Sequence, residues 1–391
     1  MRLLLALVLV AALLSSASAA AGLTPRQDEF TPITESVVAK PWPVKGSDGR
    51  YHVVYEVELT NASSLPWIVQ RVAVRNRAGR KPIVASWSSG GVQHVLQLLG
   101  SGRPASDLQP GQSALLFLTF SKPRLRDFPS GLVHQLALVN GRPSAGGPRT
   151  LTESAGATAV DRRRPVELGS PLQGSRWVAA DGCCAAPRHV RAAQPIDGRL
   201  FNAQRFAIDF ERLDEHGRLW TGDKRVLTNW AGYGQNVLAV ANGTIVRAID
   251  GRPQAVPGAL PADISVREAD GNAVFLRLAN GLVVLYAHLM PGSVTVRRGE
   301  HVRRGQVLGR VGNSGNSSAP HLHLQVVDRD ASLAANGLPF TFKRFTVTGR
   351  IASTDAFNRA EENGTPARLG RVRTGARHDE LSLDQLILTW P

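Results

Sequence analysis

Two histidines in this chain are separated by a single leucine, in the run His321-Leu322-His323. In a β-strand, residues two apart project from the same face, so both imidazoles would share one face while Leu322 and Leu324 point into the core. Imidazole binds metals and carries protons near neutral pH. The pair favours one metal ligand beside one catalytic group, but an exposed strand face can also carry two polar residues, so the sequence context has to decide.

Three ordered blocks of sequence supply that context. They read YAHL at 286–289, VRRGQVLGRVGNSG at 302–315 and SAPHLH at 318–323. The chain from about residue 200 to 330 closely resembles the lysostaphin-type zinc endopeptidases, which cleave peptide cross-bridges or stem peptides of bacterial cell walls. The resemblance implies a compact antiparallel β-sheet peptidase core and a zinc cofactor.

The resemblance also implies roles for four residues of this chain. Asp209 and His323 match two zinc ligands, and His288 and His321 match the two histidines that do not bind the metal. Zinc would lower the pKa of a bound water and polarise the scissile carbonyl, while imidazoles transfer the proton and stabilise the oxyanion.

One position departs from the family pattern. The family has a histidine ligand four residues before the aspartate, where this chain has Arg205. Arginine remains protonated and offers no lone pair, so two ligands remain where catalytic zinc normally has three. A substitute could come from elsewhere in the chain, and the candidates are Cys183, Cys184, His189 and His216.

Two further explanations of Arg205 stay open. It could pair with Asp209 as a buried structural ion pair and exclude metal, or point away and leave a weak zinc site completed by water. If the remaining site is intact, Arg205→His should raise zinc affinity, and unchanged affinity would count against the assignment of Asp209 and His323 as ligands. The leading hypothesis is a zinc metallo-endopeptidase of peptidoglycan. The alternative is an inactive lysostaphin-like domain that binds the cell wall or activates another wall hydrolase.

The N-terminus predicts export. Arg2, an apolar run of 12 residues at 3–14 and the small residues 17–19 form a signal peptide at 1–19. The run is shorter than the roughly 20 residues that cross a bilayer, so no membrane span is expected. We expect a secreted protein, periplasmic or extracellular, associated with the cell wall.

Charge and cysteine content limit the partners. The net charge is +15, from 46 basic and 31 acidic residues, but no nucleic-acid-binding motif accompanies it. A basic surface attracted to an anionic wall is therefore expected, with no nucleic-acid partner.

Cys183 and Cys184 are adjacent, and across a trans peptide their Cα atoms would lie about 3.8 Å apart, so a bond between them is not expected.

The elements that must position these residues are strands. Period-two runs at 51–59, 68–75 and 114–120 predict an immunoglobulin-like β-sandwich at 20–140. Residues 141–195 are rich in Gly, Pro and Arg and predict a linker and approach segment. Short strands with Asn-Gly turns are expected at 196–330, where the resemblance implies the peptidase domain, and a C-terminal extension follows at 331–391. The predicted fold class is all-β.

Overall fold

The structure is built almost entirely of β-strands, which confirms the predicted all-β class. The computed structural model describes residues 28–79, 83–184 and 187–391. Residues Pro32–Pro391 form one compact unit. The predicted signal peptide at 1–19 lies outside the described residues. Within the described ranges, every helix is too short or too polar to cross a membrane.

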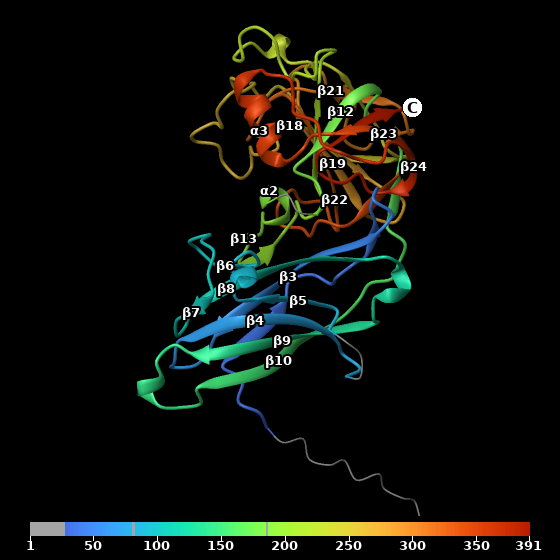
Figure 1. The fold of residues 1–391 in the computed structure, drawn as a ribbon. Helices are drawn as coiled ribbons and strands as arrows, with labels where there is room; N and C mark the ends of the chain where they lie inside the picture. The colour runs from blue at the N-terminus through green and yellow to red at the C-terminus, as the bar shows by residue number, and fades with distance from the viewer. Residues whose placement is uncertain (1–27, 80–82, 185–186) are drawn as a thin grey trace, which may run out of the picture. The chain divides into compact units, whose positions relative to one another are not determined.

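Two five-stranded antiparallel sheets form the N-terminal sandwich (Figure 1). The first has the order β1 (Ile33–Val37), β3 (Tyr51–Asn61), β8 (Ser113–Lys122) and β6 (Leu96–Leu98), with β2 (Val44–Lys45) beside β3. The second has the order β10 (Thr150–Ala159), β9 (Gly131–Asn140), β4 (Trp67–Asn76) and β5 (Ala85–Ser88), with β7 (Asp107–Leu108) beside β4. Side chains from both sheets share one core, which makes this a sandwich; the immunoglobulin-like topology remains a prediction.

Strand β3 contributes to two cores, one on each of its faces. Val53, Tyr55 and Val57 pack inside the sandwich, whereas Val54 packs in the core of the C-terminal sheet. Burial along β3 is therefore continuous from Val53 to Val57 instead of alternating. Glu56 shares the face of Val54, so a strand that looks half-exposed in sequence is covered on both sides.

The segment at 141–195, expected to be a linker, contains strands. Strand β10 pairs with β9 and so extends the sandwich to Ala159. Its sequence, TLTESAGATA, contains one large apolar residue, because it lies at the edge of its sheet and buries little. With so few apolar residues, the strand shows no alternating hydrophobic pattern that would predict it from sequence.

An eleven-stranded sheet forms the C-terminal part. Its order is β11 (Val166–Leu168), β23 (Phe340–Arg350), β25 (Leu386–Trp390), β12 (Gly174–Ala180), β15 (Ile208–Arg212), β22 (Leu322–Val327), β19 (Val283–Leu289), β18 (Asn272–Arg277), β17 (Gly243–Ile249) and β20 (His301–Val302), with β24 (Gly375–Glu380) beside β23. Two small ribbons complete it: β13 (Gln194–Ile196) with β14 (Arg199–Phe201), and β16 (Asn236–Leu238) with β21 (Val307–Arg310).

The described helices are short. They are α1 (Ser89–Val92), α2 (Pro187–Val190) and α3 (Thr354–Asn363), with single 3₁₀ turns at Leu125–Asp127, Pro143–Ala145 and Leu227–Asn229. Helix α3 begins where the Ser353 side chain accepts a hydrogen bond from the Ala356 amide, and ends at Gly364 in the left-handed conformation.

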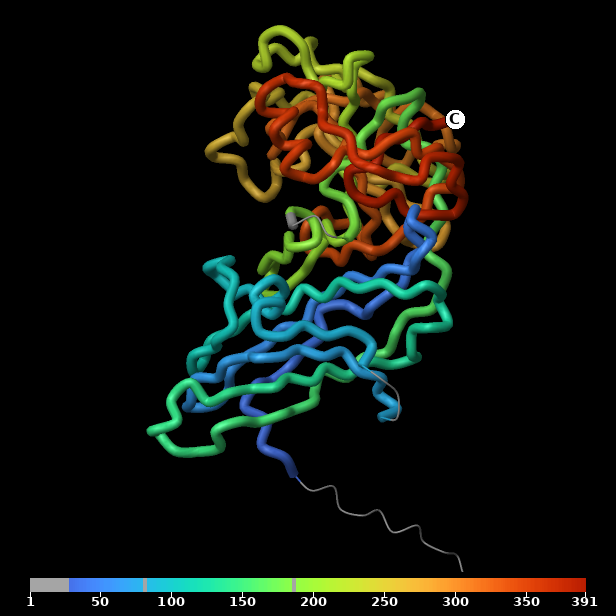
Figure 2. The backbone as a smooth tube through the Cα atoms, in the orientation of Figure 1, coloured from blue at the N-terminus to red at the C-terminus, as the bar shows by residue number. Residues whose placement is uncertain are grey.

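The predicted C-terminal extension is part of the large sheet. Strands β23, β24 and β25 all come from residues after 331, and β25 lies between β23 and β12. Figure 2 shows these red residues within the same body as the green and yellow residues that precede them in this part of the chain. Residues 331–391 therefore help to build the sheet that carries the histidines.

Candidate metal centre

Asp209 and His323 meet because their strands are neighbours in register. Strand β15 pairs antiparallel with β22, and Asp209 lies directly opposite His323. The distance from His323 Nδ1 to Asp209 Oδ1 is 2.8 Å. On the opposite face, Ile208 and Leu324 are fully buried in the core. The period-two prediction for His321 and His323 agrees with this geometry, since His321 Nε2 also lies 3.5 Å from Asp209 Oδ1.

His288 reaches the same centre through a local irregularity in β19. Ala287 lies opposite His323 and so occupies the site face, which would send the next residue of a regular strand to the core face. The register between β18 and β19 shifts at this point, and His288 has φ +62°. A bulge with a left-handed residue redirects a side chain, at a conformational cost that is typical of functional positions.

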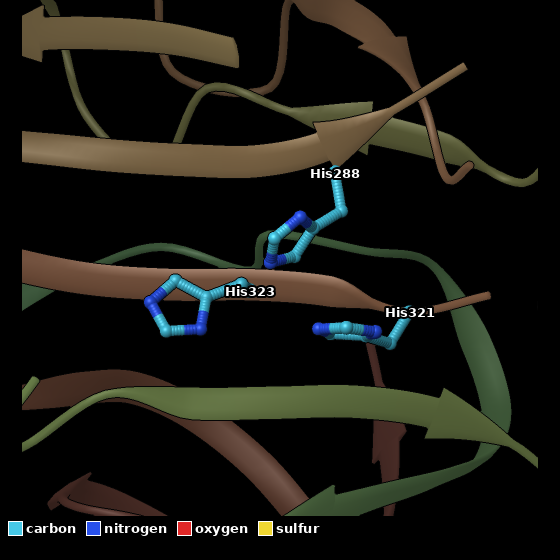
Figure 3. A group of neighbouring side chains, drawn as sticks. All are labelled: His288, His321 and His323. Carbon is cyan, nitrogen blue, oxygen red and sulfur yellow. The ribbon is translucent and has the colours of Figure 1, made fainter. Parts of the chain in front are cut away.

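The three histidines converge (Figure 3). The ring centroids of His288 and His321 lie 4.7 Å apart, and those of His288 and His323 lie 5.7 Å apart. All three side chains are at least nine-tenths buried. The structure therefore brings together all four residues that the sequence proposed for the site.

A fifth residue, His189, joins them from helix α2. Its Nε2 lies 3.4 Å from Asp209 Oδ2, and its ring packs edge-on against His323 with 4.9 Å between centroids. Ligand atoms of His189, Asp209 and His323 all lie within 4.8 Å of one another, as do those of His288, His321 and His323. Among the four proposed substitute ligands, His189 is the one that the structure places at the centre.

The other proposed substitutes lie elsewhere or are unsuited to bind zinc. His216 is largely exposed and faces Glu215. The expectation that Cys183 and Cys184 do not bond to each other is wrong, because the structure contains a disulfide between them. Zinc binds the thiolate form of cysteine, which a disulfide does not provide.

Arg205 faces away from Asp209. Its Nε donates to Glu56 Oε1 at 2.9 Å, and its Nη1 donates to the carbonyl of Gly337 at 2.8 Å. The interpretation that Arg205 pairs with Asp209 is wrong, since its carboxylate partner is Glu56. The carboxylate of Asp209 instead faces His189, His321 and His323.

Each of the four histidines has one ring nitrogen next to an oxygen acceptor. The Nδ1 atoms of His189, His288 and His321 face the carbonyls of Ala207, Ser314 and Ala319 at 3.2, 2.8 and 2.8 Å. The Nε2 of His323 faces Gln325 Oε1, also at 2.8 Å. Because these carbonyl and amide oxygens only accept, each ring donates there. The other nitrogen of His189, His288 and His321, Nε2, then carries a lone pair, whereas Nδ1 of His323 lies within hydrogen-bond distance of Asp209 Oδ1.

Burial and neighbouring charges shift the pKa values of these groups in different directions. Burial alone would raise the pKa of Asp209, but the surrounding histidines hold it well below its ordinary value. Burial lowers the pKa of His288 well below its usual range, and repulsion from His321 and His323 adds to this. Burial would also lower the pKa of His323, yet attraction to Asp209 raises it. Asp209 is thus ionised and His288 neutral at neutral pH.

Sequence reasoning missed two polar residues near the centre. Gln325 follows His323 by two residues on β22, and Glu211 follows Asp209 by two residues on β15. Burial raises the pKa of Glu211 well above its usual value, with a further increase from Glu361 and Asp209. The same period-two rule that aligned the histidines could have placed both residues on this face.

Comparison with known families agrees with the residues at this centre. Residues 228–335 match peptidase family M23. This part of the chain is therefore similar to M23 peptidases. The matched range contains His288, His321 and His323, while His189, Arg205 and Asp209 precede it. The resemblance inferred from the sequence blocks is confirmed for the part of the chain that holds the three converging histidines.

Curated relatives match the chain over short stretches. A 55-residue stretch is 49% identical to the DD-carboxypeptidase/endopeptidase Mpg of Neisseria meningitidis serogroup B, covering 14% of this chain and 12% of that protein. A 61-residue stretch is 36% identical to the peptidoglycan DD-endopeptidase ShyC of Vibrio cholerae serotype O1, covering 16% and 14%. The chain thus matches only a small part of the length of either relative.

Solved structures of M23 proteins are also similar. The catalytic domain of lysostaphin from Staphylococcus simulans is 19% identical, with 44% of this chain and 88% of that chain covered and a TM-score of 0.22. A peptidase M23 from Pseudomonas aeruginosa is 17% identical, with 68% and 87% covered and a TM-score of 0.23.

Proposed function

We propose that this chain is an exported, zinc-dependent endopeptidase of peptidoglycan whose site is formed by Asp209, His288, His321 and His323. The observation that carries the proposal is the convergence of three buried histidines around one ionised carboxylate (Figure 3). A divalent cation in place of the proton between His323 and Asp209 would neutralise this buried carboxylate and accept imidazole lone pairs.

The donor set fits zinc. Imidazole nitrogen and carboxylate oxygen are ligands that zinc accepts, and Asp209 and His323 would hold it. The hydrogen bond from His323 Nε2 to Gln325 Oε1 supports this role, because it directs Nδ1 toward Asp209, where zinc would replace the proton shared with the carboxylate. Such outer hydrogen bonds orient metal-binding histidines.

Bound zinc would supply Lewis-acid activation of the scissile carbonyl and of a water nucleophile. His288 and His321 each keep a free Nε2, since their Nδ1 atoms donate to Ser314 and Ala319. One Nε2 can accept the proton of the attacking water, and the other, once protonated, can stabilise the tetrahedral oxyanion and deliver a proton to the leaving amine. Burial of both rings restricts water and strengthens these interactions.

Three observations support a cell-wall peptide as substrate. The matched relatives are named as peptidases of this class, one of them explicitly a peptidoglycan DD-endopeptidase. The signal peptide predicted at 1–19 would bring the chain to the compartment of the wall. The net charge of +15 would concentrate it on an anionic polymer.

The test is a clearing assay on isolated cell walls with the purified mature protein. The wild type should reduce turbidity and release new amino termini, lose this activity when zinc is chelated, and regain it when zinc is restored. Wall binding with no cleavage and no metal would instead support the inactive binding or activating domain.

A further inference from the structure

A histidine in the segment before the M23 match lies at the metal centre, and the resemblance assigns it no role. His189 is on helix α2, between β12 and β13, and its side chain is about nine-tenths buried. Resting on the function proposed above, we propose that His189 is the third protein ligand of the zinc, in place of the family histidine whose position is taken by Arg205.

The distance between His189 and Asp209 suits a shared ion. Ligand atoms 2.0–2.1 Å from a tetrahedral zinc lie about 3.4 Å from one another. His189 Nε2 lies 3.4 Å from Asp209 Oδ2, and His323 approaches the other oxygen, Oδ1. The carboxylate thus lies between the two imidazoles, and all three ligand atoms fall within 4.8 Å of one another.

The ring of His189 presents the correct nitrogen. Its Nδ1 lies 3.2 Å from the carbonyl of Ala207, which can only accept, so this nitrogen carries the hydrogen. The lone pair is then on Nε2, the atom that faces Asp209. A backbone carbonyl that fixes the tautomer in this way is the usual support of a metal-binding histidine.

A second group of three, His288, His321 and His323, competes for the same role. It contains no carboxylate, so an ion held there would lack the direct charge neutralisation that Asp209 provides. It would also use both histidines that can transfer protons. Ligation by His189, Asp209 and His323 leaves His288 and His321 free and one coordination position open for water, the arrangement of a catalytic zinc.

A zinc ligand at His189 explains how the chain can have an arginine at position 205. Its guanidinium is committed to Glu56 and Gly337, so the position four residues before Asp209 has a structural role. Helix α2 brings an imidazole to the centre instead. In this chain the family position thus holds a structural arginine, Arg205, and His189 supplies the imidazole.

Cobalt substitution gives a test that does not depend on activity. We would load wild type, His189→Ala and His189→Cys with Co²⁺ and measure binding affinity and the visible and near-ultraviolet spectrum, with His216→Cys as the matched control. If residue 189 is a ligand, His189→Cys gains a cobalt–thiolate charge-transfer band that His216→Cys lacks. His189→Ala should bind metal more than about 100-fold more weakly, beyond the loss typical of an outer-shell change.

The outcomes separate this inference from the proposed function. Tight metal binding by wild type and His189→Ala alike, with no new band in His189→Cys, would overturn the role of His189 and leave the zinc enzyme intact. A folded wild type that binds no metal would overturn both. Circular dichroism of each variant, with mass analysis to confirm that the introduced thiol is free, ensures that loss of binding reports on the ligand and not on folding or disulfide exchange.

Discussion

Arg205 and Glu56 form a buried ion pair between two segments that lie 149 residues apart. The Arg205 side chain is 2% exposed and that of Glu56 fully buried. Glu56 also accepts from Asn202 Nδ2 at 2.8 Å, so its oxygens are fully engaged. The residue at a position that the resemblance assigns to a zinc ligand instead ties the start of the peptidase sheet to strand β3.

The first prediction concerns Arg205→His, which on sequence alone should raise zinc affinity. The structure adds a cost in stability, because the shorter side chain would leave the Glu56 carboxylate without its ion-pair partner. We expect a loss of about 3–5 kcal/mol in the free energy of unfolding, measured by urea denaturation. Replacing both partners, as Arg205→Met with Glu56→Leu, should cost less. Unchanged stability with tighter zinc binding in Arg205→His would show that the ion pair is not structural.

The second prediction separates proton transfer from metal binding. His321→Ala should lower the rate of wall-peptide cleavage about 10²- to 10⁴-fold, because it removes an Nε2 that moves a proton. Zinc content should stay close to that of the wild type, since ligation by His189, Asp209 and His323 does not need His321. Metal analysis beside an amino-terminus release assay checks both, with His216→Ala as a surface control. A parallel loss of zinc would make His321 a ligand.

The third prediction concerns the support of His323. Gln325→Leu removes the acceptor for His323 Nε2, so the ring loses its preferred tautomer and orientation. Zinc affinity should fall about 10- to 100-fold in a chelator competition titration. Gln325→Glu keeps an acceptor at nearly the same position and should retain most of the affinity. Equal affinities for Gln325→Leu and wild type would exclude this role.

The fourth prediction concerns the pH dependence of stability in the sandwich. The side chain of Glu35 is fully buried beside His134, with Glu153 and Tyr55 also facing it. Burial, aided by Glu153, raises the pKa of Glu35 to about 8, and burial raises that of Glu153 to about 7. Burial lowers the pKa of His134 to about 4.

The sign of the effect follows from proton counts. Between pH 4.5 and 8, folded Glu35 keeps a proton that the unfolded chain has lost, so the free energy of unfolding falls as the pH rises. His134 makes the free energy of unfolding rise with pH, because it is neutral in the folded protein while the unfolded chain is protonated, but this holds only below pH 6.5. Urea midpoints should therefore decline from pH 6.5 to 8 in the wild type and in the exposed control Glu215→Gln, and decline less in Glu35→Gln. Parallel profiles for all three proteins would contradict the assignment.

The sequence could predict those site residues that depend on local periodicity. His321 and His323 share a face because strands repeat every two residues, and family resemblance added Asp209 and His288. The way His288 reaches the site was not predictable, since its bulge and positive φ depend on pairing with β18. Helix α2 is four residues long and has no pattern, so His189 could only be one of several candidates.

Long-range contacts account for the remaining differences. The pairing of Arg205 with Glu56 requires β3 to be covered on both faces, which its alternating sequence does not indicate. Strand β10 has the composition expected of a linker, because an edge strand needs few apolar residues. In both cases, tertiary surroundings outweighed the local pattern.

The position of β25 has a consequence for the order in which the protein can assemble. Residues 386–390 lie between β23 and β12, and β12 in turn borders β15, which carries Asp209. Until that segment is available, β12 and β23 present unpaired edges and the sheet around Asp209 is incomplete. A nascent chain that lacks residues 386–390 therefore could not complete the sheet around Asp209.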